Sequence, residues 1–340
     1  MRPLHAFRKT VAILGIALGI AVALCFVPED PYQRWQLLDG TIHANARWIY
    51  ERIHDDPAPI DVVFVGPSRI ERGVNAPRLA ADLAAQGLPS NVVNFSLPEA
   101  GRDINFVIVN ELLKTKRPKL IVIGVTEKPS RFGHPAFKFL ADAHQVVAPG
   151  YLSDLSYFSD LAYLPYRKAE LLAADLAPGI LGPSRNFDAV SYRGHSVDTT
   201  GSVHLPDGTI KDGEHPAPRA ELTRGVRKLE RGMHAPILPA RYADLEFGDE
   251  RTNVRRIAQL AKGKGVQIAF LFLPYYTGPS TIQEAVFYRR YGPIWNAGYL
   301  AQDSTIFMDY GHLTRSGAIG LTDWLVKPVA DELKTAVGEP

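Results

Sequence analysis

Short apolar runs alternate with longer helical patterns through much of this chain, and this alternation limits the possible fold more than any other feature. Five runs rich in Val, Ile and Phe have the length and composition of strands buried on both faces. We therefore expect an α/β fold with a doubly wound parallel sheet of about five strands. The expected strands are residues 60–65, 91–95, 120–125, 266–273 and 305–308, and the expected helices are residues 76–86, 103–116, 250–262 and 314–333.

Composition excludes several classes of protein. The 340 residues are 46% hydrophobic and 22% charged, which indicates a globular chain with a real core. The net charge is +2 and no basic run is present, so we expect no nucleic-acid partner. The single cysteine, Cys25, excludes an internal disulfide. His195, His204 and His215 lack the close spacing of metal ligands, so the sequence predicts neither a metal site nor a cofactor.

An apolar segment near the N-terminus predicts a membrane helix. Residues 11–27 are 17 consecutive uncharged positions, preceded by Arg2, Arg8 and Lys9. A helix of this length rises about 25 Å, which is the short end of a membrane span and longer than most cleaved signals. We therefore expect a retained signal-anchor. Cleavage after residues 21–23 (Ala-Val-Ala) is the competing interpretation, and a buried core helix is a weaker one.

Charge around the apolar segment predicts its orientation. Basic residues precede it and the acidic Glu29 and Asp30 follow it, so the positive-inside rule places the N-terminus in the cytoplasm. The remaining chain is then exported, to the periplasm or the cell exterior. The expected division is a cytoplasmic tail (1–10), a transmembrane helix (11–27), a stalk or linker helix that packs onto the domain (28–58) and the domain itself (59–340).

Strand–helix alternation fails between about residues 150 and 249, which are rich in proline. We interpret this stretch as a large insertion near the mouth of the functional site. A turn-rich piece within it predicts a β-hairpin around Asp207 and Gly208.

Candidate catalytic residues follow the first and last expected strands. Ser68 comes after the first strand, and Asp309 and His312 come after the last. Functional residues of an open parallel sheet gather at the carboxyl ends of its strands. A serine nucleophile needs a base to accept its proton, and the base needs a third group to orient it. An Asp three residues before a His can contact one ring nitrogen and leave the other free. Ser68, His312 and Asp309 fit these three roles.

This arrangement resembles the SGNH (GDSL-like) hydrolase superfamily, with its Gly-x-Ser turn after the first strand and Asp-x-x-His before the last helix. The resemblance covers roughly residues 60–146 and 266–333. It is closest to a membrane-anchored, exported branch with Gly-x-Ser-Arg, which includes proteins of extracellular polysaccharide acetylation. The resemblance implies Ser68 as nucleophile, His312 as base and Asp309 as the orienting acid.

Two blocks of the family pattern differ in this chain. The second block opens at Asn94, a candidate substrate contact, but its glycine, Gly101, comes late. The third block reads Gly-Val-Thr-Glu-Lys (124–128) and lacks the family's asparagine. Candidate oxyanion donors are therefore the backbone amides of Ser68, Arg69 and Gly101.

Two arginines next to the serine allow two interpretations. Arg69 and Arg72 are candidates to bind an anionic group of the substrate. Structural ion pairs with Glu71 or Glu99 are the alternative.

The candidate triad and the resemblance together imply an anchored serine esterase or O-acyltransferase that acts on acyl esters, expected to be acetyl esters, of an envelope or exported polysaccharide. Expected partners are the membrane, the polysaccharide or a small acyl ester, and proteins of polysaccharide synthesis or acetylation. The alternative is a catalytically inactive protein of this fold that binds carbohydrate or assists assembly.

Overall fold

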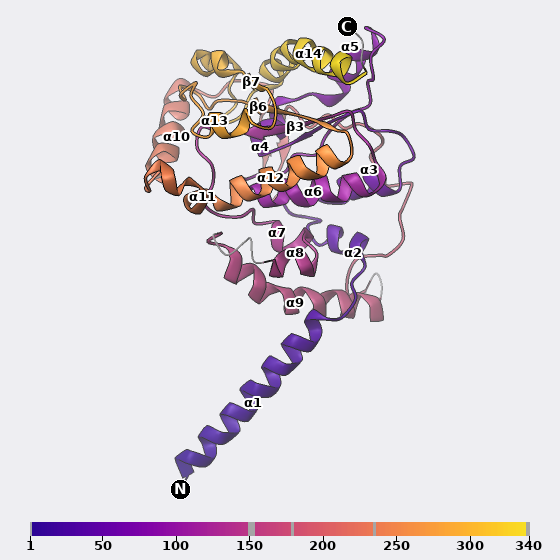
Figure 1. The fold of residues 1–340 in the computed structure, drawn as a ribbon, viewed down its shortest axis with the longest axis vertical. Helices are drawn as coiled ribbons and strands as arrows, with labels where there is room; N and C mark the ends of the chain where they lie inside the picture. Colours follow the sequence, from indigo (N-terminus) through magenta and orange to yellow (C-terminus); the bar gives the residue numbers. More distant parts are fainter. Residues whose placement is uncertain (1, 149–153, 178–179, 234–235, 338–340) are drawn as a thin grey trace.

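A five-stranded parallel sheet forms the centre of the molecule (Figure 1). The structure, a computed structural model, describes residues 2–148, 154–177, 180–233 and 236–337. The strand order is β2-β1-β3-β6-β7, and every neighbouring pair is parallel. The strands are β1 (Val62–Val65), β2 (Val92–Asn94), β3 (Leu120–Val125), β6 (Gln267–Phe272) and β7 (Ile294–Asn296). The expected α/β class with a parallel sheet is confirmed.

Helices cover both faces of this sheet because successive side chains of each strand point to opposite faces. One core cluster joins Val63, Ile121 and Phe270 to helices α3 (Asn45–His54), α6 (Arg102–Thr115) and α12 (Gly248–Gly263). The other joins alternate strand residues to helices on the opposite face. These are α4 (Ser68–Gly73), α5 (Ala76–Ala84), α10 (Arg219–Gly232) and α14 (Arg315–Val337).

The expected strand at residues 305–308 is wrong. The carboxylate of Asp303 accepts a hydrogen bond from the Thr305 backbone, and this contact starts the 3₁₀ helix η4 (Ser304–Ile306). After it, Phe307 forms only an isolated antiparallel bridge with Leu313. The fifth strand is instead β7, which pairs with β6 and has only three residues. Its sequence, Ile-Trp-Asn, is too short to form the kind of apolar run that marked the other strands.

The expected hairpin in the insertion is confirmed. Strands β4 (Val203–His204) and β5 (Ile210–Lys211) pair antiparallel, and Gly208 in the turn has a φ of 82°, which favours glycine. Between β3 and the hairpin the chain forms α7 (Phe137–Leu140), α8 (Ala143–Val147) and α9 (Tyr157–Leu176). Later elements are η2 (Ala240–Tyr242), α11 (Ala243–Glu246), α13 (Ala285–Tyr288) and η3 (Gly298–Gln302).

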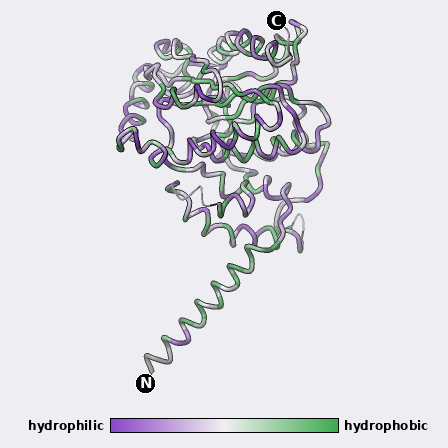
Figure 2. Tube along the Cα trace, in the orientation of Figure 1, coloured by the Kyte–Doolittle hydropathy of each residue, from purple (hydrophilic) through white to green (hydrophobic). Residues whose placement is uncertain are grey.

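Helix α1 (Arg2–Cys25) extends away from the rest of the molecule (Figure 1). Its residues Phe7–Cys25 are long and apolar enough to cross a membrane, and none of this stretch is buried inside the protein. Figure 2 shows the apolar character along this helix. A buried core helix is therefore excluded as the interpretation of this segment.

The segment between α1 and β1 packs into the domain. It forms α2 (Pro31–Gln36) and α3, and it buries Trp35, Trp48 and Ile49 in the same core cluster as the sheet. The carboxylate of Asp30 begins α2 by accepting the Gln33 backbone N–H. Residues 28–58 therefore contribute to the core of the domain.

Candidate active site

Ser68 lies directly after the first strand, in a turn that requires a glycine. Strand β1 ends at Val65, and after Gly66 and Pro67 the chain enters α4 with Ser68 as its first residue. A Cβ atom on Gly66 would lie 2.9 Å from Cγ1 of Ile70 and 3.1 Å from Cα of Gly124. The turn therefore presses against β3, and this close approach holds Ser68 at the carboxyl end of the sheet.

A chain of hydrogen bonds joins Ser68 to a histidine and an aspartate. Oγ of Ser68 lies 2.8 Å from Nε2 of His312, and Nδ1 of His312 lies 2.8 Å from both carboxylate oxygens of Asp309. Asp309 also accepts the backbone N–H groups of Gly311 and His312, which closes the tight turn between the two side chains. The structure thus brings together the three residues that sequence spacing selected.

Asp309 is held as a carboxylate. Burial alone would raise its pKa, but the hydrogen bond and charge of His312 and the Gly311 N–H outweigh this, and the pKa of Asp309 is lowered. An ionised Asp309 can accept the Nδ1–H of His312, which leaves Nε2 directed at Oγ of Ser68. The lowered pKa of Asp309 therefore suits its role as the group that orients His312.

These three side chains open into a cavity of about 480 Å³. Its wall combines the loop between α2 and α3, the turn at Ser68, residues 98 and 99 after β2, the β4–β5 hairpin and the turn at His312. This size is within the usual range of small-molecule sites. The lining residues are Thr41, Ile42, Ala44, Asn45, Ser68, Glu71, Arg72, Pro98, Glu99, Val203, His204, Leu205, Lys211, Met308, Asp309, Tyr310 and His312.

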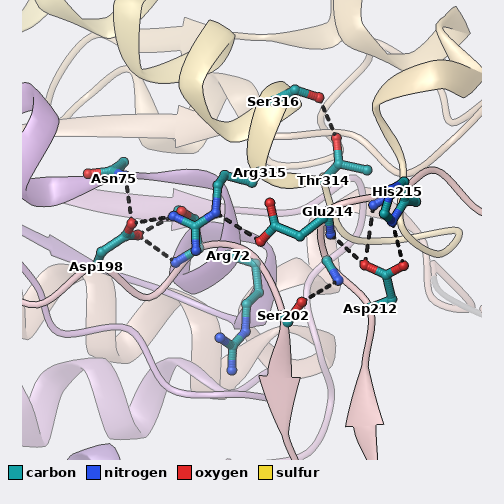
Figure 3. Close-up of polar contacts among 12 residues, drawn as sticks. Arg72, Asn75, Asp198, Ser202, Asp212, Glu214, His215, Thr314, Arg315 and Ser316 are labelled. Carbon is teal, nitrogen blue, oxygen red and sulfur yellow. Dashed lines mark hydrogen bonds and ion pairs between the residues drawn. The ribbon is translucent and has the colours of Figure 1, made fainter.

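Arg315, three residues after His312, forms contacts on both sides of the hairpin, with Asp198 and Glu214 (Figure 3). Its Nε lies 2.9 Å from the Glu214 carboxylate, after the hairpin, and its Nη1 lies 2.9 Å from the Asp198 carboxylate, before it. Asn75 donates a further hydrogen bond to Asp198. The first turn of α14 thus holds both ends of the segment that forms one cavity wall.

The two candidate arginines have different surroundings. Nη1 of Arg69 lies 2.7 Å and 2.9 Å from the two carboxylate oxygens of Glu127, and the guanidinium lies over the ring of Tyr275. Arg69 does not line the cavity, so its side chain forms a structural ion pair, with Glu127 as its partner. Arg72 does line the cavity, and its Nη1 donates a hydrogen bond to the backbone of Thr199.

Asn94 has a structural position, which contradicts its candidacy as a substrate contact. Its side chain is buried and donates to the backbone carbonyls of Ile70, Glu71 and Val74, at the end of α4. Its own side-chain oxygen accepts the Ser96 N–H. Asn94 therefore stabilises the C-terminal end of the helix that begins with Ser68.

Gly101 also lies outside the cavity that contains Ser68. It packs so closely on His134 that a Cβ atom would lie 2.3 Å from the backbone nitrogen of that residue. The second block reaches the cavity through Pro98 and Glu99 instead, and Glu99 has a left-handed φ of 71°. The candidate oxyanion donors that remain are the amide of Ser68, which lines the cavity, and that of Arg69, the next residue of α4.

Sequence reasoning missed several cavity residues, among them Glu71, Glu99, His204 and Lys211. Glu71 is buried, which raises its pKa, and its Oε1 accepts a hydrogen bond from Asn45. Glu71 follows Ser68 by one helical turn, a spacing that could have indicated it. The insertion was expected near the mouth of the site, and its hairpin does line the cavity, but no local pattern indicates which of its residues do so.

Among the described residues, one group of acidic side chains is spaced as metal ligands are. Carboxylate oxygens of Asp103, Asp154 and Asp249 all lie within 4.8 Å of one another, and none of the three lines the Ser68 cavity. These carboxylates accept backbone N–H groups, including those of Arg102 and His134. Burial raises the pKa of Asp249 to about 7 and raises that of Asp103 as well.

The known proteins compared with this chain assign it to no family. No protein-family model matches it, and no curated protein matches it.

Proposed function

We propose that this protein is a membrane-anchored serine esterase or O-acyltransferase of the SGNH type that acts on acyl esters. The hydrogen-bonded series Asp309–His312–Ser68, which opens into a cavity of about 480 Å³, carries this proposal. A serine with this support is a nucleophile at neutral pH, whereas an isolated serine hydroxyl is a poor one.

The reaction proceeds in two steps. Oγ of Ser68 attacks the acyl carbonyl while Nε2 of His312 takes its proton, and the alcohol then leaves with that proton. Water or a sugar hydroxyl next attacks the acyl-enzyme, gives its proton to His312 and restores Ser68. Asp309 stabilises the imidazolium in both steps. No metal or organic cofactor takes part in this scheme.

Negative charge that develops on the carbonyl oxygen needs donors close to Ser68. The first amides of a helix have no intrahelical partner, and Ser68 and Arg69 are the first two residues of α4. We assign the oxyanion hole to these two amides. The chain lacks the third-block asparagine that would supply a further donor. Loss of one donor typically lowers the rate by about 10²–10³-fold and leaves measurable activity, so two amides are enough for this proposal.

Strand order supports the family assignment within this proposal. The order β2-β1-β3-β6-β7 corresponds to 2-1-3-4-5 for five successive parallel strands, the order of flavodoxin-like sheets. The Gly-x-Ser-Arg turn follows the first strand, and Asp-x-x-His precedes the last helix, α14. Resemblance to the exported branch of the SGNH superfamily makes an envelope or exported polysaccharide the proposed acyl carrier.

Charge around α1 supports export of the domain. Arg8 and Lys9 lie at its N-terminal side, whereas Glu29 and Asp30 follow it. By the positive-inside rule the domain lies outside the cytoplasm. A C-terminal reporter that is active only outside the cytoplasm should therefore give signal, and activity of a cytoplasm-specific reporter alone would reverse this topology.

A second function is favoured by the third block. At the position where the family has an asparagine amide donor, this chain has Glu127. Its carboxylate is paired with Arg69 and cannot donate a hydrogen bond. An inactive protein of this fold that binds carbohydrate or assists assembly would retain the cavity and need no oxyanion hole.

A fluorophosphonate probe separates the two functions because it labels only an activated serine. The full chain in detergent should be labelled, Ser68→Ala should not be, and the partly buried loop control Ser130→Ala should be labelled like the wild type. Equal labelling of Ser68→Ala and the wild type, or no labelling of either, would reject the proposed nucleophile.

A further inference from the structure

Helix α9 has an outward face made only of uncharged, mainly apolar residues. Successive residues of an α-helix are rotated by about 100°, so positions separated by three or four residues share one face. On α9 the face that includes Phe158 and Leu176 has no charged residue, and these two residues are 74% and 80% exposed. That face consists of Phe158, Ala162, Pro165, Tyr166, Ala169, Leu172, Ala173 and Leu176.

The charged residues of α9 lie outside this face, because Glu170 and Asp175 are partly exposed along its two edges and the other three point into the protein. Asp160, Arg167 and Lys168 are buried. The Arg167 guanidinium donates to the backbone carbonyls of Lys138 and Ala141, and α9 packs against α7 and α8. A helix at a water-exposed surface normally has the reverse polarity, with its apolar face toward the core. The outward face of α9 is therefore suited to an apolar environment.

Contacts at the end of α1 fix α9 beside the candidate membrane span. Nζ of Lys168 donates a 2.7 Å hydrogen bond to the backbone carbonyl of Val27, two residues after the span ends at Cys25. The carboxylate of Glu29 lies 3.0 Å from Arg167 and 3.3 Å from Lys168. These contacts hold the middle of α9 at the level where α1 ends.

The arrangement of the helices agrees with these contacts. Figure 1 shows α9 along the edge of the domain from which α1 extends, with α7 and α8 between α9 and the sheet. The 19 residues of the span rise about 28 Å, close to the thickness of the apolar layer of a bilayer. The bilayer surface thus falls near Cys25. Exposed apolar residues continue the surface around α9, namely Phe26, Leu155, Ile180 and Leu181.

We propose that the outward face of α9 lies in the interfacial layer of the same membrane that α1 spans. Lipid is the occupant because this face is continuous with the end of the span and contains both aliphatic and aromatic side chains, as interfacial helices do. This inference rests on the membrane anchoring in the proposed function and is independent of the serine chemistry. Two contacts, α1 and α9, then fix the orientation of the domain on the membrane.

Lipid-borne quenchers test this contact in the full chain. In a Cys25→Ser background, an environment-sensitive fluorophore is attached to Phe158→Cys, Leu176→Cys, Ile16→Cys or Val286→Cys. Val286 on α13 is a matched control, because it is 71% exposed and apolar but lies on a different part of the domain. Each protein is reconstituted in phosphatidylcholine–phosphatidylglycerol nanodiscs that contain nitroxide lipids, with the nitroxide either near the headgroup or near the end of the chain.

The headgroup-level nitroxide should quench most of the emission at Phe158→Cys and Leu176→Cys and leave Val286→Cys unquenched. The deep nitroxide should quench Ile16→Cys most strongly. If Ile16→Cys is quenched while the α9 probes behave like Val286→Cys, α1 spans the membrane and the α9 contact is rejected. Blue-shifted but unquenched α9 probes would show that a protein covers this face, which also rejects lipid as the occupant. Any of these results leaves the fluorophosphonate test unaffected.

Discussion

Oγ of Ser68 and Nε2 of His312 lie 2.8 Å apart although 244 positions separate the two residues in the chain. The folded sheet brings the two turns together, and Ser68 is only partly buried there. Ser68→Ala should therefore abolish ester turnover and leave the thermal midpoint nearly unchanged. Measuring hydrolysis of an acetyl ester and thermal unfolding on the same preparation checks both parts.

His312 and Asp309 should give effects of different size. His312→Ala removes the proton acceptor and should approach the Ser68→Ala background. Asp309→Asn should cost up to about 10⁴ in kcat, because it favours the wrong imidazole tautomer. Adding Ser68→Ala to either variant should cost almost nothing more, since members of one catalytic unit are strongly non-additive. Additive losses would mean that the three residues act separately.

Asn94→Ala should lower the free energy of unfolding by about 1–3 kcal/mol, because it leaves buried carbonyls of α4 without a donor. It should also lower kcat, since α4 begins with Ser68. Urea unfolding and steady-state kinetics measure these effects. The control is Asn296→Ala, whose side chain makes an exposed contact to a backbone carbonyl. A higher KM with unchanged stability would instead make Asn94 a substrate contact.

Arg315→Ala should loosen the cavity wall formed by the hairpin. Its ion pairs with Asp198 and Glu214 are exposed, so stability should change by less than about 1 kcal/mol. Proteolysis within residues 203–211 should become faster and KM should rise, while Ser68 remains reactive to fluorophosphonate. Lys327→Ala, which breaks the exposed pair with Asp331 on the same helix, is the control. Equal proteolysis in the two variants would contradict a holding role for Arg315.

Asp249 should make the protein less stable as pH rises toward neutrality. Burial, together with the charges of Asp154 and Glu250, raises its pKa to about 7 in the folded protein. Its pKa in the unfolded chain is about 3.9. Between these values the folded state binds more protons, so the free energy of unfolding falls as pH rises through about 7.

Comparison with Asp249→Asn tests this contribution together with that of Asp103, whose pKa the Asp249 charge also raises. Burial lowers the pKa of His134 to about 3, which adds a change of opposite sign, but this change is present in both proteins. Between about pH 5 and pH 8, the wild type should therefore lose more stability than the variant in urea unfolding. Parallel curves would show that Asp249 titrates normally.

The sequence predicted most of the sheet because β1, β3 and β6 are apolar runs whose composition does not depend on distant residues. The prediction of a last strand at residues 305–308 was wrong, because Asp303, which lies outside this apolar run, caps a 3₁₀ helix at Thr305. The prediction that the His312 turn lies near the end of the first strand is nevertheless consistent with the structure. In place of a strand, a bridge between Phe307 and Leu313 closes the base of this turn.

The surroundings of the site were less predictable. The pairing of Arg69 with Glu127 and the burial of Asn94 under α4 depend on contacts between distant segments. Lys211 lines the cavity from a hairpin segment that Arg315 holds beside the His312 turn, a contact between distant parts of the chain. Local patterns thus predicted which residues meet at the strand ends, whereas the cavity wall required the tertiary structure.

The most direct test of the central claim is mass spectrometry of the full chain, quenched with acid shortly after mixing with an acetyl ester. The wild type should contain a peptide acetylated on Ser68, and His312→Ala should contain almost none, because its serine lacks a base. Turnover of the ester without acetylation of Ser68, or equal acetylation in His312→Ala, would contradict the proposed nucleophile.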